Sequence, residues 1–288
     1  MRRIPAGVLP LAVAAALLMV FVCPGLLAQK KGKIMNEEGE AKGGIGNLTI
    51  TVVYDNNPYK QELETSWGFS CLITGTEKTI LFDTGGDGSI LLSNMEKLAI
   101  EPNSIDTVVL SHIHGDHTGG LDDFLKQNSD VEVYLLKSFP EQFKDSVRRY
   151  GSKVIEVEQN CKICENVYST GQLGTLIREQ ALIIKTDKGL ILITGCAHPG
   201  IVKIVNSAKD LLKGDVLLVM GGFHLEWAMK GKIEKIISAF KQLPVRYVGP
   251  CHCTGDKARK LFEKHFGENY INIGAGKVIS LGDFGMER

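Results

Sequence analysis

The 288-residue sequence has no net charge, no internal repeat and no low-complexity tract. Its 33 basic residues balance 33 acidic ones. No cluster of Lys or Arg stands beside residues 111–120, the segment with the most potential metal ligands. Because nucleic acids and anionic lipids are normally met by a basic patch, these absences exclude nucleic acid as a partner. The 44% content of hydrophobic residues excludes extensive disorder. A chain of this length buries a sufficient core by itself, so any metal it holds serves function.

The first 28 residues differ in composition from the rest of the chain. They contain Arg2 and Arg3, no acidic residue and an apolar stretch over residues 8–22, and they end in the small residue Ala28. This order is typical of a secretory signal peptide. We therefore predict export to the periplasm or the extracellular space, with cleavage after Ala28. The alternative is an uncleaved membrane anchor over residues 4–27.

The remaining chain divides into a tether and a single domain. Residues 29–46 are polar and rich in Gly and Lys, which predicts a flexible tether. Residues 47–288 alternate β-rich runs with stretches of helical spacing, which predicts one α/β domain. Strands are expected at residues 48–54, 70–74, 79–83, 106–110, 131–137, 180–186, 190–194, 216–220, 246–249 and 277–281, and helices at 89–100, 121–126, 141–150, 201–212, 233–243 and 256–266. This pattern alone fits two sheets with helices outside or one open sheet.

The chemistry is concentrated directly after the expected strand at residues 106–110. Four candidate metal ligands stand within six residues there: His112, His114, Asp116 and His117. In an extended stretch residues i and i+2 point the same way, so His112 and His114 can share one ion. Asp116 and His117, which follow a turn at Gly115, can face a second ion. Packing does not require such a density of ligands, so the segment predicts a metal site.

Three further histidines follow β-rich runs and stand beside Gly or Pro. They are His198 in GCAHPG, His224 in GGFHL and His252 in PCHCTG. Sites in α/β folds are usually built by the loops at strand ends, so these residues are expected to join the same site. His265, inside an amphipathic stretch, is expected to be a solvated side chain.

These motifs resemble those of the metallo-β-lactamase superfamily. His112-Ile113-His114-Gly115-Asp116-His117 matches its His-x-His-x-Asp-His motif, and residues 81–85 (LFDTG) resemble the strand end that precedes it. Residues 195–201, 221–225 and 250–255 look like the branch that includes the archaeal 7,8-dihydropterin-6-methyl-4-(β-D-ribofuranosyl)aminobenzene 5′-phosphate synthase. The resemblance implies an αββα sandwich with metals at one edge between the sheets.

The resemblance also implies roles for individual residues, which fall into two ligand sets. The first metal would be held by His112, His114 and His198, and the second by Asp116, His117 and His252. The sequence departs from the superfamily at the exit of the expected strand 216–220, where Gly221 and Gly222 replace the usual bridging Asp. Either His224 contributes as a ligand or a substrate contact, or no protein group bridges the ions. One or two divalent ions are therefore expected.

The ligand set and the resemblance together predict the chemistry. Imidazoles and one carboxylate suit zinc, with manganese or iron as alternatives, and thiolate-rich binding is not indicated. We expect a metal-activated water, with Asp116 accepting a proton and His224 in a catalytic role. Asp83 and Thr118 either orient the histidines through hydrogen bonds or cap turns. Asp55-Asn56 and residues 67–70 are candidates for a pocket wall.

The main functional hypothesis is a hydrolase acting on a small anionic substrate that carries phosphate. The alternative is a synthase of the named branch, which the resemblance implies would join a dihydropterin pyrophosphate to a ribofuranosyl-aminobenzene phosphate. A second alternative is an exported protein that binds a metal or ligand without catalysis. The sequence makes no prediction of the oligomeric state.

The cysteines give a separate set of expectations. Without Cys23, which lies in the expected signal segment, six remain, and export would permit disulfides. Cys161 and Cys164 are expected to form a local disulfide. Cys251 and Cys253 are expected to point away from the metal that His252 faces, and Cys196 is expected to be buried packing.

Overall fold

The computed structural model describes residues 47–285. The predicted signal segment and tether, residues 1–46, lie outside the described residues, so export and cleavage stay predictions. Among the residues that are described, no helix is long and apolar enough to cross a membrane.

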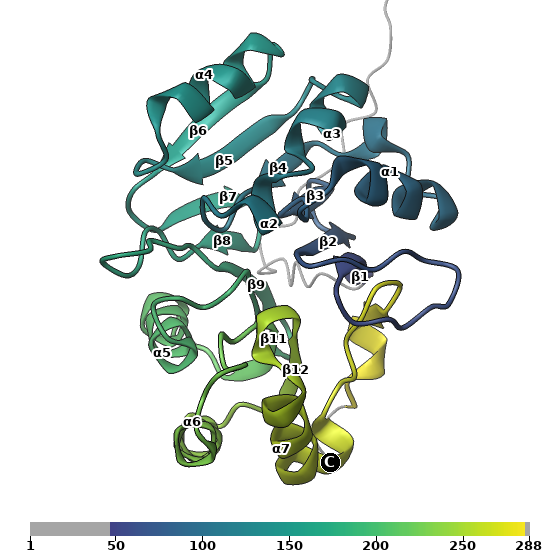
Figure 1. The fold of residues 1–288 in the computed structure, drawn as a ribbon. Coiled ribbons are helices and arrows are strands. Elements are labelled where there is room, and N and C mark those ends of the chain that lie inside the picture. The colour runs from purple at the N-terminus through teal and green to yellow at the C-terminus, as the bar shows by residue number, and fades with distance from the viewer. Residues whose placement is uncertain (1–46, 286–288) are drawn as a thin grey trace, which may run out of the picture. The chain divides into compact units, whose positions relative to one another are not determined.

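The described strands form two sheets (Figure 1). The seven-stranded sheet has the order β13-β1-β2-β3-β4-β5-β6, and the six-stranded sheet has the order β12-β11-β10-β9-β8-β7. The first sheet consists of β1 (Thr49–Asp55), β2 (Phe69–Thr74), β3 (Ile80–Phe82), β4 (Thr107–Val109), β5 (Glu132–Leu136), β6 (Lys153–Val157) and β13 (Val278–Ser280). The second consists of β7 (Cys161–Cys164), β8 (Val167–Ser169), β9 (Leu182–Thr186), β10 (Gly189–Thr194), β11 (Val216–Gly222) and β12 (Tyr247–Cys251).

Helices cover the outer face of each sheet. The helices are α1 (Gly88–Lys97), α2 (Gly115–Thr118), α3 (Leu121–Gln127), α4 (Glu141–Arg149), α5 (Ile201–Leu212), α6 (Lys230–Gln242) and α7 (Asp256–Phe266). In Figure 1, α1, α3 and α4 lie along the seven-stranded sheet, and α5, α6 and α7 lie along the other. The predicted αββα sandwich is confirmed, and a single open sheet is wrong.

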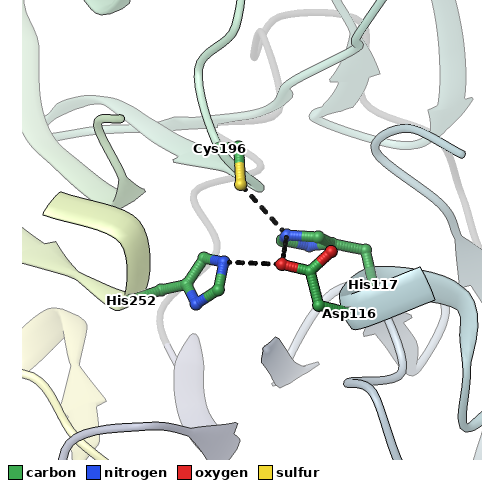
Figure 2. Close-up of side chains that lie close together, drawn as sticks. All are labelled: Asp116, His117, Cys196 and His252. Carbon is green, nitrogen blue, oxygen red and sulfur yellow. Dashed lines mark hydrogen bonds and ion pairs between the residues drawn. The ribbon is translucent and has the colours of Figure 1, made fainter. Parts of the chain in front are cut away.

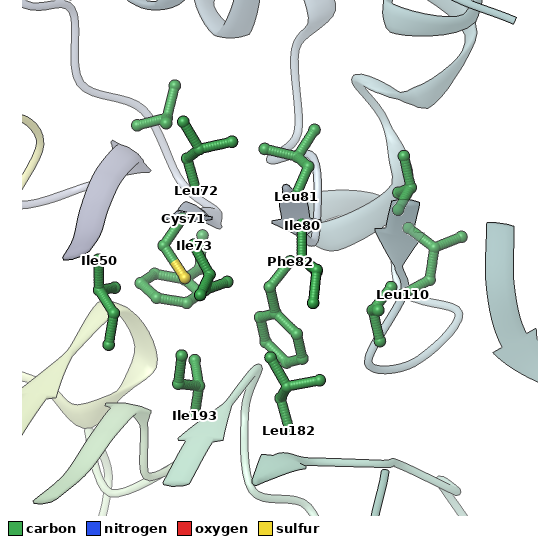
Figure 3. Close-up of a cluster of buried hydrophobic side chains, with 14 of the residues drawn as sticks. Ile50, Cys71, Leu72, Ile73, Ile80, Leu81, Phe82, Leu110, Leu182 and Ile193 are labelled. Carbon is green, nitrogen blue, oxygen red and sulfur yellow. The ribbon is translucent and has the colours of Figure 1, made fainter. Parts of the chain in front are cut away.

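The side chains of β10 explain why this sandwich forms. Ile191 and Ile193 belong to the core that includes the seven-stranded sheet, whereas Leu190 and Leu192 pack with the cluster that includes α5–α7. Alternation along a strand sends successive side chains to opposite faces, so a strand covered on both sides is apolar throughout. Figure 3 shows Ile193 and Leu182 pointing from the second sheet towards Phe82 and Cys71 of the first.

The segment around Cys161 is more ordered than the sequence predicts. It contains β6, β7 and β8, where the sequence predicts no strand between residues 150 and 180. Cys161 and Cys164 are both free thiols, so the predicted local disulfide is wrong. The two residues stand at the ends of an extended strand, which separates their α-carbons by roughly 10 Å, beyond the 7 Å that a disulfide tolerates.

The arrangement of the parallel strands brings the candidate site together. β3 and β4 run parallel in the first sheet, and β10, β11 and β12 run parallel in the second. Parallel strands present their carboxyl ends at the same edge, where ligands bind in α/β folds. The loops that carry the seven candidate residues follow β4, β10, β11 and β12, so the fold delivers them to one edge of the sandwich.

Candidate metal centre

Among residues 47–285 the structure brings the side chains predicted from sequence into three groups of possible ligands, two of which share no residue. The all-histidine group consists of His112, His114 and His198. The mixed group consists of Asp116, His117, His252 and Cys196, a residue that the sequence analysis assigned to packing. Within each group the ligand atoms lie within 4.8 Å of one another.

The residues of the all-histidine group come from two loops, one in each half of the chain. His112 Nε2 lies 3.1 Å from His114 Nδ1, and the His198 ring centre lies 4.8 Å from that of His112 and 4.9 Å from that of His114. The other ring nitrogen of His112 lies 2.9 Å from the Ser111 hydroxyl, which fixes the orientation of the ring. His112 is fully buried.

The mixed group surrounds the carboxylate of Asp116 (Figure 2). Asp116 Oδ2 lies 3.2 Å from His252 Nε2 and 3.6 Å from His117 Nε2. The Cys196 thiol lies 3.2 Å from that same nitrogen of His117. Asp116 and His117 stand on the short helix α2, and Cys196 and His252 come from the opposite half of the chain.

Asp83 anchors both groups from the end of β3. Its carboxylate accepts hydrogen bonds from the Ser111 amide at 2.6 Å and the Ser111 hydroxyl at 2.7 Å, and it lies 2.7 Å from His117 Nδ1. Asp83 therefore orients His117 directly and His112 through Ser111, which supports the predicted orienting role. Thr118 instead donates its hydroxyl proton to the His114 carbonyl at 3.2 Å, a bond that caps a turn.

Glu179 fixes the loop that carries Cys196 and His198, and sequence reasoning missed it. Its fully buried carboxylate accepts the backbone N–H groups of Cys196, Ala197 and His198 at 2.8–2.9 Å. Burial raises the pKa of Glu179 to about 7, although the three amides oppose this shift. A single Glu before an apolar strand gives no sequence signal of such a role.

His252 is positioned from the first sheet. Its Nδ1 lies 2.8 Å from the Asn56 side-chain oxygen, and the Trp67 ring centre lies 4.8 Å from its own. These contacts place both candidate wall segments beside the centre. Cys253 is absent from the ligand group that contains His252, and its thiol contacts the Cys196 carbonyl at 3.8 Å. β12 ends at Cys251 and His252 has a φ of +48°, so strand alternation does not continue.

His224 stands beside the centre rather than inside either group. Its exposed ring has its centre 4.5 Å from that of His198. With Cys196 and His198 it forms the third group of possible ligands, whose ligand atoms lie within 4.8 Å of one another. A pocket of about 300 Å³ opens there. It is lined by His224, Trp67, Cys253, Glu226, Trp227, Ala228 and Lys232.

The electrostatics of the two groups differ. Burial and the neighbouring histidines lower the pKa of His112 well below its usual range, and burial with His224 lowers the pKa of His198 to about 4. Burial also opposes ionisation of Asp116, but the hydrogen bond from His252 and the charge of His117 outweigh it and hold its pKa low. Burial lowers the pKa of His117, yet Asp83 reverses this and raises it. Burial thus favours neutral imidazoles at His112 and His198, and the mixed group contains an ionised carboxylate.

These donors fit divalent cations. Nε2 of His198 is buried and has no hydrogen-bond partner among residues 47–285. His112, His117 and His252 each have one ring nitrogen held by Ser111, Asp83 or Asn56, while the other faces the group. A histidine that ligates a metal almost always has its second nitrogen bonded in this way. The residues present therefore match a metal centre in both composition and orientation.

The fold and this centre define a class of protein. The model of the metallo-beta-lactamase superfamily matches residues 68–252, and the chain belongs to that superfamily. The chain is 31% identical to the 7,8-dihydropterin-6-methyl-4-(beta-D-ribofuranosyl)-aminobenzene-5'-phosphate synthase of Methanocaldococcus jannaschii, over 82% of this chain and 98% of the relative. An uncharacterized protein of the same archaeon is 29% identical, over 81% of this chain and 100% of the relative.

Solved structures give the same class. The crystal structure of Tm1679, described as a metal-dependent hydrolase of the beta-lactamase superfamily, has a TM-score of 0.69 and 30% sequence identity, covering 81% of this chain and 98% of that one. The metallo-beta-lactamase fold protein YhfI of Bacillus subtilis, at 16% identity and a TM-score of 0.60, covers 81% of this chain and 99% of its own and shares the fold.

Proposed function

We propose that this protein is a metal-dependent hydrolase that acts on a small anionic substrate carrying phosphate. The observation that carries the proposal is the convergence of the all-histidine and mixed groups on adjacent points. The rings of His224 and Trp67, which contact His198 and His252, line a pocket beside them. When bound there, divalent cations supply Lewis-acid activation of a water and of the substrate's electrophilic atom. Zinc suits the imidazole and carboxylate donors, with manganese or iron as alternatives.

The residues of the chain have distinct parts in this reaction. Asp116, held as a carboxylate at the centre of the mixed group, accepts the proton of the attacking water. His224 faces the pocket beside His198 and contacts the substrate. Lys232 attracts an anionic substituent, while Trp67 and Trp227 offer apolar walls.

The test is a panel of phosphomonoester, phosphodiester, lactone and β-lactam probes, assayed with protein whose bound metal is measured by elemental analysis. We expect turnover of a phosphate-bearing probe that His114→Ala abolishes and His265→Ala preserves, since His265 is an exposed residue of α7. Full activity in His114→Ala would contradict the proposal. An absence of turnover by metal-loaded protein would favour a non-catalytic binding protein.

A second candidate is a synthase, and the 31% identity to the archaeal synthase favours it. In that case the same centre would serve displacement of pyrophosphate rather than attack by water. Incubation with a dihydropterin pyrophosphate and a ribofuranosyl-aminobenzene phosphate separates the two candidates. The synthase forms the joined product, whereas the hydrolase releases phosphate or pyrophosphate without it.

Export is part of the proposal because the synthase's substrates are expected inside the cell. N-terminal sequencing of protein recovered from outside the cytoplasm is expected to begin at Gln29. A chain found in the cytoplasm with its first residues intact would remove this objection to the synthase.

A further inference from the structure

Cys196 has its thiol inside the metal centre. Its side chain is only 3% exposed, and Sγ lies 3.2 Å from His117 Nε2. Sγ also lies within 4.8 Å of the ligand atoms of Asp116 and His252. It also lies within 4.8 Å of those of His198 and His224, so it adjoins both the mixed group and His198 of the all-histidine group. Figure 2 shows the thiol pointing at the other three residues of the mixed group.

The backbone holds this thiol in place. The carboxylate of Glu179 binds three successive amides, those of residues 196–198, and Ala197 adopts a φ of +56° between them. A positive φ at a residue other than glycine is uncommon and costs free energy, so the surrounding structure must impose it. The result is that Cys196 and His198 both face the centre, one in each group.

The exit of β11 has no room for the bridging carboxylate that the superfamily usually places there. A Cβ at Gly222 would lie 2.4 Å from the Gly195 carbonyl oxygen and 2.7 Å from the Cys253 thiol. A Cβ at Gly221 would lie 2.0 Å from the Thr194 carbonyl oxygen, and Gly221 has a φ of +109°. The two glycines are therefore required by close packing, and the anionic group must come from elsewhere.

The nearby buried carboxylates already have other partners. Asp83 is bound by Ser111 and His117 Nδ1, and Glu179 by the three amides. Asp116 alone would leave a dication in the mixed group with one negative ligand. The Cys196 thiol is placed to add a second, because a divalent cation deprotonates a coordinating thiol.

We propose that Cys196 is a thiolate ligand of the metal held by Asp116, His117 and His252, and takes the place of the bridging carboxylate. The inference rests on the proposed function only in requiring a metal centre. It predicts a four-coordinate Asp-His-His-Cys site, a donor set that favours zinc or cobalt(II) over manganese or magnesium. A single thiolate among four ligands is compatible with the expectation that binding is not thiolate-rich.

The experiment is reconstitution of the metal-free full-length protein with cobalt(II), followed by absorption spectroscopy. We expect a near-ultraviolet charge-transfer band from sulfur to cobalt in the unaltered protein. Cys196→Ser is expected to lose this band and to weaken cobalt binding in the mixed group by more than tenfold. Cys253→Ser is the matched control and keeps the band, since Cys253 belongs to none of the ligand groups found among residues 47–285.

The outcomes separate this inference from the proposed function. Two bound cobalt ions with visible bands but no charge-transfer band would overturn the role of Cys196 and leave the metal centre standing. No bound cobalt would overturn both. A band that survives Cys196→Ser, or vanishes only in Cys253→Ser, would also overturn the assignment.

A second measurement needs no variant and covers the case in which Cys196→Ser does not fold. X-ray absorption at the zinc edge of the unaltered protein is expected to detect one sulfur ligand for every two zinc ions, at about 2.3 Å. Nitrogen and oxygen ligands alone would contradict the inference.

Discussion

The all-histidine and mixed groups lie side by side but differ in charge. A ligating imidazole carries no charge, so a dication held by His112, His114 and His198 keeps its full charge. In the mixed group, Asp116 and, under our inference, the Cys196 thiolate offset the charge of a second dication. The field that attracts an anionic substrate then arises mainly at the all-histidine group. His224 and its pocket stand on that side, next to His198.

The largest expected effect comes from removing one ligand from each group. His114→Ala and Asp116→Asn should each lower catalysis to background, because activation of the water and orientation of the substrate both need the intact metal centre. Elemental analysis should show the loss of one metal ion in each variant, from a different group. His265→Ala is the control, and a variant that loses both ions would contradict independent groups.

A smaller effect should follow from removing the residue that orients one ring in each group. Ser111→Ala frees Nδ1 of His112, and Asn56→Ala frees Nδ1 of His252. Each should weaken metal binding in its own group by about 10–100-fold, as loss of such partners usually does. Competition with a chromophoric chelator measures both affinities, and each variant is the control for the other. Equal losses in both groups would show that they behave as one unit.

The sequence predicts only those residues of the site that stand close together along the chain. His112, His114, Asp116 and His117 share one loop, so their spacing alone predicts a metal site. Asn56 acts on His252 across 196 positions, and the Cys196 thiol meets His117 across 79. No local pattern encodes such contacts, because they exist only once the two sheets have packed face to face.

The same reasoning explains which parts of the fold were predicted. β10 and β11 are covered on both faces and read as continuous apolar runs, and α5 and α7 begin and end where the sequence indicates. β6 is half exposed, and β7 and β8 are short, with cysteine and tyrosine in place of aliphatic residues. Strands of that kind depend on pairing with their neighbours and carry no strong periodicity of their own.

The metal-free protein should be less stable at pH 5 than at pH 7, with His198 contributing roughly 1 kcal/mol to the difference. The pKa of His198 falls from 6.5 to about 4 on folding, so stability decreases as pH falls from 6.5 towards 4. The pKa of His117 is raised, so its contribution is present below 6.5 and is lost as pH rises through the folded value. Partial exposure of His198 screens the effect, which keeps the estimate near roughly 1 kcal/mol.

Urea unfolding of the metal-free protein at pH 7 and pH 5 measures this difference. His198→Gln should lose less stability than the unaltered protein between the two pH values, because it lacks the group that resists protonation. His265→Ala, altered at an exposed histidine, should follow the unaltered protein. An identical pH dependence in His198→Gln and the unaltered protein would contradict the lowered pKa of His198.

The smallest effect on metal binding is expected at Thr118, which stands next to both groups and serves neither metal. Its hydroxyl bonds the His114 carbonyl and not an imidazole, so Thr118→Val removes a turn bond and leaves the rings held by Ser111, Asp83 and Asn56. We expect a loss of about 1 kcal/mol in the free energy of unfolding and metal affinities within about twofold of the unaltered protein. A tenfold loss of affinity would show that the His114 backbone, and not only the ring contacts, sets the geometry of the all-histidine group.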